Sequence, residues 1–263
     1  MKVSEIMERL FTLSFDRPAS RVCDSCKMGD PDKEVNKVGI TMFPTPEVLK
    51  QAAQWGADLL IIHEPIFYDH LDRITEESQR QAKKKIIDES QMALYRYHDH
   101  PHFREEDFIA KGMVKQMAFN GKAEYITPGA LVRITLDAPM TALQVAKQIE
   151  TNCNLRHIRI VGARDLPATK ISGMFGAPDG VLEELQNEES EIVLVGETCE
   201  WMIAEYARDA AQFGKNKTLM ILGHCGSEEG GMMYVKEVFS QLFPELPVKY
   251  FTSGEVYTYT DSQ

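Results

Sequence analysis

Histidine and acidic side chains gather in three short segments of this 263-residue chain, and five of its seven histidines lie in them. The segments are His63-Glu64-Pro65, His98 to His102, and His224 with Glu228. Neutral imidazole and carboxylate are the usual protein ligands of zinc, iron and manganese. We therefore interpret the three segments as the ligands of one or two divalent metal ions.

The spacing of His224 and Glu228 is informative, because residues four apart meet on one face of a helix. If the segment is not helical, Gly226-Ser227 leaves the backbone free to fold both side chains onto one ion. The alternative without a metal is that His224 makes a hydrogen bond in a loop while Glu228 lies near the positive end of the following helix. Taken alone, such a pair favours this alternative.

His63 and Glu64 are adjacent, so their side chains diverge if the backbone is extended. Both can face one ion only if the backbone kinks; otherwise they suit two ions. In the segment from His98 to His102, three histidines alternate with other residues. We expect at least one of the three to support a ligand rather than to bind metal itself.

Cys23 and Cys26 form a single Cys-x-x-Cys pair. A zinc site made of cysteines needs two such pairs. We expect two reduced thiols, with an auxiliary metal or redox role as the alternative.

Three glycines, Gly173, Gly176 and Gly180, lie between a predicted strand and a predicted helix. Their backbone amides could cradle a phosphate, but the spacing matches neither the P-loop nor the dinucleotide fingerprint. Turn formation explains them equally well.

Predicted strands and helices alternate along the chain, which is typical of an α/β fold. Asp58 to Ile62 is apolar on both faces and suits a central strand covered by helices. Met92 to Tyr97 and Thr218 to Leu222 are also predicted strands, so each polar segment follows a strand. Open α/β sheets bind ligands at the carboxyl ends of their strands, where the polar segments would then lie.

The other predicted elements complete this alternation. The strands are Val38–Phe43, Leu131–Leu136, Ile158–Val161, Ile171–Phe175 and Glu191–Val195. The first helix starts at the N-cap Thr45 and Pro46, and Gly56 stops it after Trp55. The other helices are Glu76–Ser90, Met140–Glu150, Glu200–Phe213 and about Glu229–Phe239. A domain boundary is expected near residues 122–129, where Gly121 and Pro128-Gly129 interrupt the pattern. It divides the chain into domains 1–125 and 126–263.

The composition excludes several classes of function. The net charge is −11, with 40 acidic and 29 basic residues, which argues against a nucleic-acid partner. The basic stretch Lys83 to Lys85 is interpreted as a solvated helix face. No apolar run reaches the ~20 residues that span a bilayer, and residues 1–15 lack the apolar core of a secretory signal. Five cysteines, an odd number, fit a reducing cytoplasm.

The ordered motifs resemble the NIF three-like family, the GTP cyclohydrolase I type two homologues, which are dinuclear metal proteins. The segments that carry the resemblance are Gly29 to Pro31, Val38 to Thr41, Thr45 to Val48, Gly56 to Pro65, Gly223 to Glu229 and Gly231-Met232. The resemblance implies two interlocked three-layer α/β domains with mixed sheets, and the last metal motif at the domain interface. It also implies a homohexamer with metal sites facing an internal cavity, and hydrolysis of GTP or a related nucleotide.

Three departures from the family pattern concern the site. The family's His-His-Pro is His63-Glu64-Pro65 here, and its His-x-x-x-Asp becomes His98 to His102. The two exchanges preserve the number and total charge of the ligands, which favours a retained metal site. An imidazole at His102 cannot bridge two ions, however, so Glu64 or Glu228 must do so, or a single ion binds. The Asn-x-Gly-Leu that the resemblance implies before Gly29 is replaced by Ser25 to Met28, so the implied substrate contacts do not carry over at this segment.

The sequence thus predicts a metal-dependent hydrolase acting on a nucleotide or another small cyclic amide or phosphate. The expected metal ligands are His63, Glu64, His102, His224 and Glu228. His98, as a proton relay, and Glu228 are the expected catalytic groups. The alternative is a metal-binding assembly or chaperone-like protein without enzymatic activity.

Overall fold

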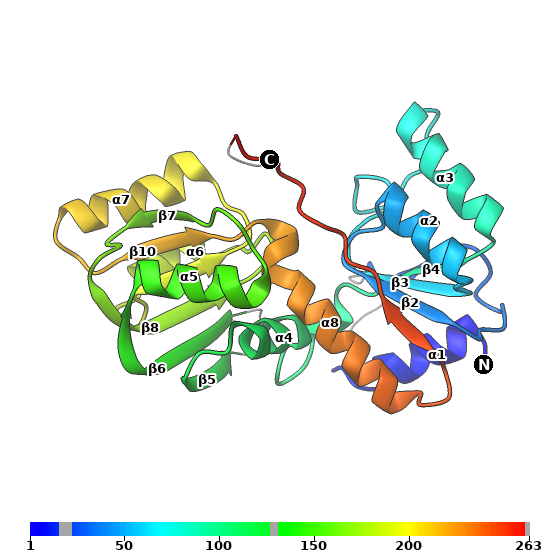
Figure 1. The fold of residues 1–263 in the computed structure, drawn as a ribbon, viewed down its shortest axis with the longest axis horizontal. Coiled ribbons are helices and arrows are strands. Elements are labelled where there is room, and N and C mark those ends of the chain that lie inside the picture. Colours follow the sequence, from blue (N-terminus) through cyan, green and yellow to red (C-terminus); the bar gives the residue numbers. More distant parts are fainter. Residues whose placement is uncertain (16–22, 127–130, 261–263) are drawn as a thin grey trace. The chain divides into compact units, whose positions relative to one another are not determined.

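The computed structural model describes residues 1–15, 23–126 and 131–260, which form two compact units (Figure 1). The first unit comprises Met1–Arg104 and Met232–Gln263, and the second comprises Glu105–Gly231. Both ends of the chain therefore build the first unit, and the second unit is inserted between them. Each unit is described by itself.

The expected boundary between residues 125 and 126 differs from this division. It falls inside β5 (Gly121–Ile126), which pairs along its whole length with β6 (Leu131–Thr141). A boundary there would separate two hydrogen-bonded strands of one sheet. Residues 127–130, which include the expected signal Pro128-Gly129, lie outside the described residues.

The first unit contains a five-stranded sheet in the order β1-β4-β3-β2-β11. Its strands are β1 (Ser25–Met28), β2 (Val38–Thr41), β3 (Leu59–Ile62), β4 (Ala93–Arg96) and β11 (Val248–Tyr250). β1 is antiparallel to β4, and the other neighbours are parallel. The three predicted strands of this region are confirmed, and the C-terminal strand β11 completes the sheet.

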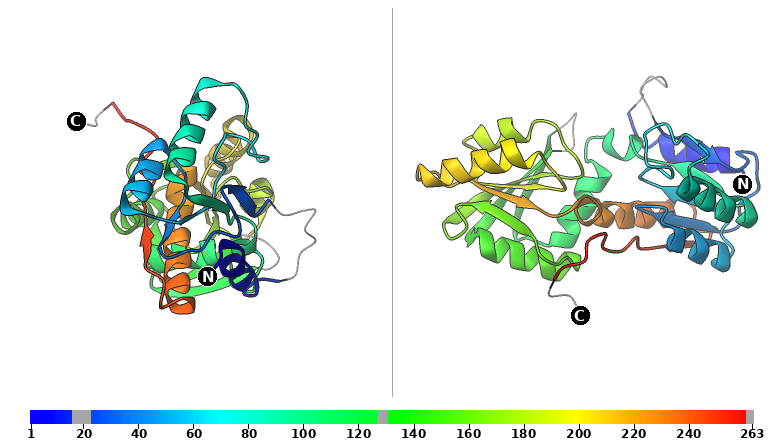
Figure 2. Two further views of the ribbon diagram at one scale, coloured as in Figure 1. Left: turned by 90° about the vertical axis from the view of Figure 1, so that its right-hand side faces the viewer. Right: turned by 90° about the horizontal axis from the view of Figure 1, so that it is seen from above.

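Helices cover both faces of this sheet (Figures 1 and 2). α2 (Pro46–Trp55) and α3 (Ser78–Ser90) pack on the face that carries Leu60 and Ile62. α1 (Val3–Phe11) and the C-terminal part of α8 (His224–Leu242) lie on the other face. The predicted signals at the ends of α2 are confirmed: the Thr45 hydroxyl accepts the Val48 amide at 3.2 Å, and Gly56 ends the helix at φ 78°.

The expectation of a solvated basic face on α3 is wrong for one residue. Lys83 is 5% exposed, and its Nζ donates to the carbonyl of Ile66 at 2.7 Å and lies 4.9 Å from the Tyr68 ring. The helical turn brings this lysine toward the sheet while its neighbours face solvent. Burial lowers the pKa of Lys83 to about 8, although the nearby Asp72 carboxylate acts in the opposite direction.

The second unit contains a six-stranded mixed sheet in the order β5-β6-β8-β9-β10-β7. β8 (Pro167–Met174), β9 (Ile192–Val195) and β10 (Thr218–Ile221) are parallel, whereas β7 (Arg159–Gly162) and the two strands at the other edge are antiparallel. α4 (Phe108–Met117) and α5 (Ala142–Cys153) cover one face. α6 (Val181–Gln186) and α7 (Glu205–Gln212) cover the other, and a π-helical turn, Glu200–Ala204, precedes α7. Each unit is thus a three-layer α/β structure, as predicted.

α8 begins at His224, five residues before its expected start near Glu229. The observed helix contains Gly226, Gly230 and Gly231, and each interior glycine disfavours a helix by about 1 kcal/mol. In the structure these glycines are required by packing: a Cβ on Gly231 would lie 2.4 Å from the Cα of Ile109, and one on Gly112 would lie 2.3 Å from the carbonyl oxygen of Gly230. α4 and α8 therefore approach backbone to backbone. No helix in the described ranges is long and apolar enough to cross a membrane.

Candidate metal centre

The backbone kinks directly after β3, at His63 and Glu64. Both amides donate to the carbonyl of Met42, at 3.3 and 3.0 Å, so the chain leaves the extended conformation at this point. Arg96, which is fully buried, donates from Nε to the carbonyl of His63 at 3.1 Å, and its Nη2 lies 3.8 Å from Glu64 Oε2. Of the two conformations that the sequence allows for this segment, extended and kinked, the structure contains the kinked one.

The loop that follows β4 carries the second polar segment and is held by Asp24. One carboxylate oxygen of Asp24 accepts the amides of His98 and Asp99, both at 2.8 Å. The other oxygen accepts the amide of His100 at 3.0 Å and its Nδ1 at 2.7 Å. The loop then forms a 3₁₀ turn, His100–His102. Sequence reasoning missed Asp24, because the loop that it holds lies 74 residues farther along the chain and no local pattern marks the contact.

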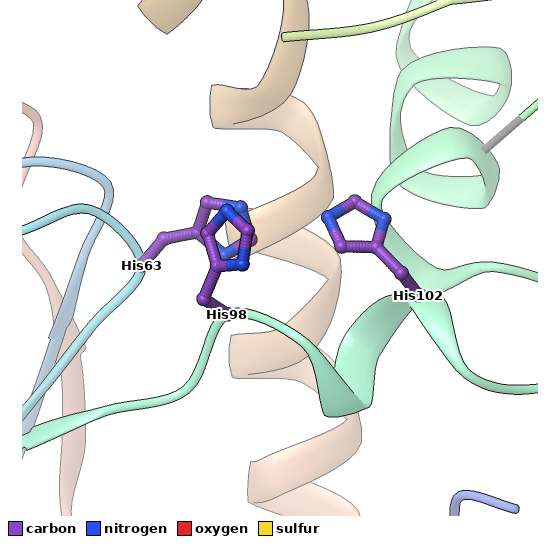
Figure 3. Close-up of side chains that lie close together, drawn as sticks. All are labelled: His63, His98 and His102. Carbon is purple, nitrogen blue, oxygen red and sulfur yellow. The ribbon is translucent and has the colours of Figure 1, made fainter. Parts of the chain in front are cut away.

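His63, His98 and His102 lie together in the first unit (Figure 3). One nitrogen from each ring lies within 4.8 Å of the other two. The His63 ring stacks on His98 with centroids 4.5 Å apart, and the His102 ring lies 5.5 and 5.7 Å from them. Zinc–nitrogen bonds of ~2.0–2.1 Å place neighbouring nitrogens roughly 3.4 Å apart, so the three nitrogens must move closer together to bind one ion.

Hydrogen bonds at Nδ1 orient two of these rings. His63 Nδ1 lies 3.2 Å from the carbonyl oxygen of Tyr97, and His98 Nδ1 lies 2.8 Å from Asp99 Oδ1. An acceptor at Nδ1 fixes the proton there and leaves the Nε2 lone pair for a metal. Glu64 Oε1 lies 3.6 Å from His98 Nε2, so a carboxylate oxygen is a further candidate ligand near this nitrogen.

Asp99 is suited to this supporting role because it stays ionised. Burial acts to raise the pKa of Asp99, but hydrogen bonds from His98 and from the Cys23 amide outweigh it and hold the pKa well below the usual range. The sequence placed Asp99 between two histidines, and that position was the only signal of its role. The predicted proton relay, His98, lies among the three candidate ligands, and its catalytic role stays a prediction.

In the second unit, His224 and Glu228 form a further group of candidate metal ligands. Because α8 begins at His224, the two side chains share a helix face, and His224 Nε2 lies 3.2 Å from Glu228 Oε2. His224 Nδ1 lies 2.9 Å from Glu197 Oε1, so this ring also meets an acceptor at Nδ1. The Glu228 side chain is only 5% exposed. Sequence reasoning missed Glu197, which follows β9 as His224 follows β10.

The glycine-rich loop after β8 packs against this turn of α8. The Gly176 amide donates to Ser227 Oγ at 2.9 Å, and Ser227 Oγ donates to the His224 carbonyl at 2.9 Å. Gly176 has φ 70°, and a Cβ there would lie 2.5 Å from Glu228 Oε1. Turn formation and close packing thus account for this glycine, and the neighbouring carboxylate opposes a phosphate at the same place.

A groove of about 580 Å³ lies beyond the carboxyl ends of β8 and β9. Glu197, which contacts His224, is one of its lining residues, together with Asp179 and Glu183. No lysine, arginine or histidine is among the described residues that line it. The groove therefore has a net negative lining next to one candidate metal ligand.

Cys23 and Cys26 are free, half-buried thiols, as expected. Burial raises the pKa of Cys23 to about 12, while the Arg96 guanidinium acts in the opposite direction. The Cys23 sulfur lies within 4.8 Å of a ligand atom of His98 and of Asp99, which makes a second group of candidate ligands in the first unit.

Two relatives of this chain share part of its sequence. A Clostridium perfringens protein named GTP cyclohydrolase 1 type 2 homolog is 22% identical over 220 residues, which cover 80% of each chain. A Methanocaldococcus jannaschii protein of the same name is 31% identical over 103 residues, or 37% of this chain and 40% of the relative. These names describe the relatives.

Solved structures resemble the fold over nearly the whole chain. A Bacillus cereus protein related to NIF3 superposes with a TM-score of 0.79 at 12% identity and covers 99% of both chains. Reduced HcgD from Methanocaldococcus jannaschii gives a TM-score of 0.73 at 18% identity, covering 95% of this chain and 97% of that one. The model of the family Duf34/NIF3 (NGG1p interacting factor 3) matches residues 1–255. The predicted resemblance is confirmed, and the chain belongs to the Duf34/NIF3 family.

Proposed function

We propose that the protein binds divalent metal ions through two sets of ligands. The first set is His63, His98 and His102, and the second is His224 with Glu228. The observation that carries the proposal is the meeting of the three imidazoles of the first set, whose nitrogens lie within 4.8 Å of one another. Rings held by acceptors at Nδ1 are typical of metal-binding histidines.

The remaining predicted ligand, Glu64, fits the first set as an additional carboxylate, because Oε1 lies 3.6 Å from His98 Nε2. Mixed nitrogen and oxygen donors suit zinc, iron and manganese. A dinuclear centre remains part of the prediction, and the metal content measured per chain decides between one ion and two.

We further propose that the bound metal serves hydrolysis of a small molecule. A divalent ion at such a site polarises a carbonyl or phosphoryl oxygen and makes water more acidic. We assign both predicted roles to Glu228: Oε2, 3.2 Å from His224 Nε2, holds the ion, while the other carboxylate oxygen accepts a proton. The names of the relatives suggest a cyclic amide of the GTP type as substrate.

The charge of the groove bears on the choice of substrate. Asp179, Glu183 and Glu197 line it, and carboxylates repel a polyphosphate. An uncharged or cationic cyclic amide therefore fits this groove better than GTP does.

The second candidate function is a metal-binding assembly without enzymatic activity, and the predicted homohexamer belongs to both candidates. Removing a structural metal lowers the melting temperature or dissociates the oligomer, whereas removing a catalytic metal need not. Light scattering and thermal unfolding before and after chelation separate the two.

The metal proposal is tested by measuring metal content after reconstitution. His63→Ala, His98→Ala and His102→Ala are expected to lose the metal of the first set, and His224→Ala and Glu228→Ala that of the second. His70→Ala is the matched control, because His70 is exposed and belongs to neither set. Unchanged metal content in all five variants would contradict the proposal.

A further inference from the structure

Cys23, His98 and Asp99 bring three potential ligand atoms together beside the His98 ring. The Cys23 sulfur, a His98 nitrogen and an Asp99 carboxylate oxygen all lie within 4.8 Å of one another. Asp99 Oδ1 is 2.8 Å from His98 Nδ1, and Asp99 Oδ2 accepts the Cys23 amide at 2.7 Å. Nδ1 is therefore the nitrogen that faces this group.

The backbone holds these groups in place without help from an ion. Asp24, the residue after Cys23, accepts the amides of His98 and Asp99. β1, which follows at Ser25, pairs with β4, which leads to His98. The two segments that carry the three ligands are thus connected at several points, so binding an ion here orders little additional chain.

We propose that Cys23, His98 Nδ1 and Asp99 form a second metal site in the first unit, for zinc or another thiophilic divalent ion. Zinc bonds of ~2.3 Å to sulfur and ~2.0–2.2 Å to nitrogen and oxygen place tetrahedral neighbours roughly 3.3–3.6 Å apart. The three ligand atoms, which now lie within 4.8 Å of one another, must move closer together when an ion binds. Three protein ligands leave the fourth position for water or another ligand.

The structure distinguishes the two cysteines of the Cys-x-x-Cys pair. Cys26 Sγ lies 3.4 Å from the carbonyl oxygen of Met28, and Cys26 belongs to none of the candidate ligand groups of the described residues. The pair is therefore not a two-cysteine metal motif. Of the two cysteines, Cys23 belongs to the proposed site, together with His98 and Asp99, which follow β4 in the chain.

Proton release accompanies binding, because the ligands must be deprotonated. The bond from the metal to Cys23 Sγ replaces the S–H bond, and the bond to His98 Nδ1 displaces the hydrogen that faces Asp99. When no second ion is bound, His98 can keep one proton on Nε2, and only the thiol proton is released to solvent. When the set containing His63 and His102 is also occupied, the His98 ring becomes an imidazolate bridge between two ions, and both protons are released.

The inference rests on the proposed function in one respect, since His98 is shared with the first set. Cobalt(II) separates the two, because cobalt bound by imidazoles absorbs in the visible, whereas a cobalt–thiolate bond adds a charge-transfer band in the near ultraviolet. Titration of the metal-free protein with cobalt(II) is expected to produce both absorptions. A visible absorption without the thiolate band overturns the inference and leaves the proposed function standing; no absorption at all contradicts both.

Single variants assign the thiolate band. Cys23→Ser is expected to abolish the band, and Asp99→Asn to weaken cobalt binding there, whereas Cys26→Ser, the matched control from the same motif, should retain it. A band that survives in Cys23→Ser, or that is lost in Cys225→Ser instead, overturns the inference. Alkylation of the unaltered chain gives an independent readout: zinc should protect Cys23, identified by mass spectrometry, while Cys26 stays reactive. Equal protection of the two thiols also overturns it.

Discussion

Replacing Asp24 by asparagine removes one of the two carboxylate oxygens that hold the loop carrying His98 and His102. The carboxylate accepts four hydrogen bonds of 2.7–3.0 Å, three from backbone amides and one from His100 Nδ1, besides a longer one of 3.8 Å from Cys23 Sγ. The Asp24 side chain is fully buried, so water cannot replace them. An amide keeps two of the four bonds and places its NH₂ group against the two donors that remain.

The expected cost follows from those two lost bonds. A hydrogen bond to a charged group contributes about 1.5–3 kcal/mol, so two lost bonds give about 3–6 kcal/mol as an upper limit for the substitution. Part of this loss is local, because the loop can detach while the sheet stays folded. We therefore expect a smaller decrease in the free energy of unfolding, and a 10- to 100-fold weaker metal affinity, which is typical when a supporting residue is removed.

Competition with a chromophoric chelator measures the affinity, and urea unfolding of the metal-free protein measures the stability. Asp32→Asn is the matched control: Asp32 is 69% exposed and pairs with Lys2 at 3.1 Å, so its loss should cost less than about 1 kcal/mol and leave metal affinity unchanged. If Asp24→Asn binds metal as tightly as the unaltered protein, the loop does not depend on Asp24 and the reasoning is refuted.

Three further predictions concern other parts of the molecule. Glu197→Gln should weaken metal binding at His224 by about 10- to 100-fold in a metal titration, because Nδ1 loses its carboxylate partner. Gly176→Ala should lower the free energy of unfolding in urea by about 1–3 kcal/mol more than Gly214→Ala. Both glycines have positive φ, 70° and 79°, but only at Gly176 would a Cβ meet the first turn of α8, 2.5 Å from a carboxylate oxygen. Burial lowers the pKa of Lys83 from 10.5 to about 8, so between these pH values the unfolded chain binds more protons than the folded one. The stability of the unaltered protein therefore gains from Lys83 as pH rises from about 8 to 10.5. Unfolding measured at several pH values should show Lys83→Met losing stability relative to the unaltered protein over this range.

Each of these predictions has a control and an opposing result. Glu200→Gln, an exposed carboxylate paired with Arg159, should leave metal affinity unchanged; an equal loss in both glutamine variants would show a general effect of charge. Equal destabilisation by the two alanine substitutions would mean that backbone strain alone limits Gly176. Lys84→Met, which affects an exposed lysine paired with Asp88, should show no such pH dependence, and a flat curve for Lys83→Met would contradict the lowered pKa.

The strands of both sheets could be predicted largely because their signals are local. Leu59 to Ile62 is apolar on both faces, and it forms a fully buried central strand with parallel neighbours. The Thr45-Pro46 start and Gly56 end of α2 also depend only on nearby residues. The domain division could not be found in this way, because β11 pairs with β2 across about two hundred residues of chain. No local pattern records such a pairing.

The sequence by itself determined which side chains can bind metal and that they follow strands, since residue type and alternation are written in the chain. Only the tertiary structure decided how those side chains are held. Three contacts join segments that are distant in sequence. They are the hydrogen bonds that kink the chain at His63, those from the His98 loop to Asp24, and the contact of Glu197 with His224. Hydrogen bonds of this kind depend on which strands become neighbours, and pairing of strands is a property of the whole fold. The pairing of strands also brings Cys23, which in the sequence is one half of a cysteine pair, next to His98 and Asp99.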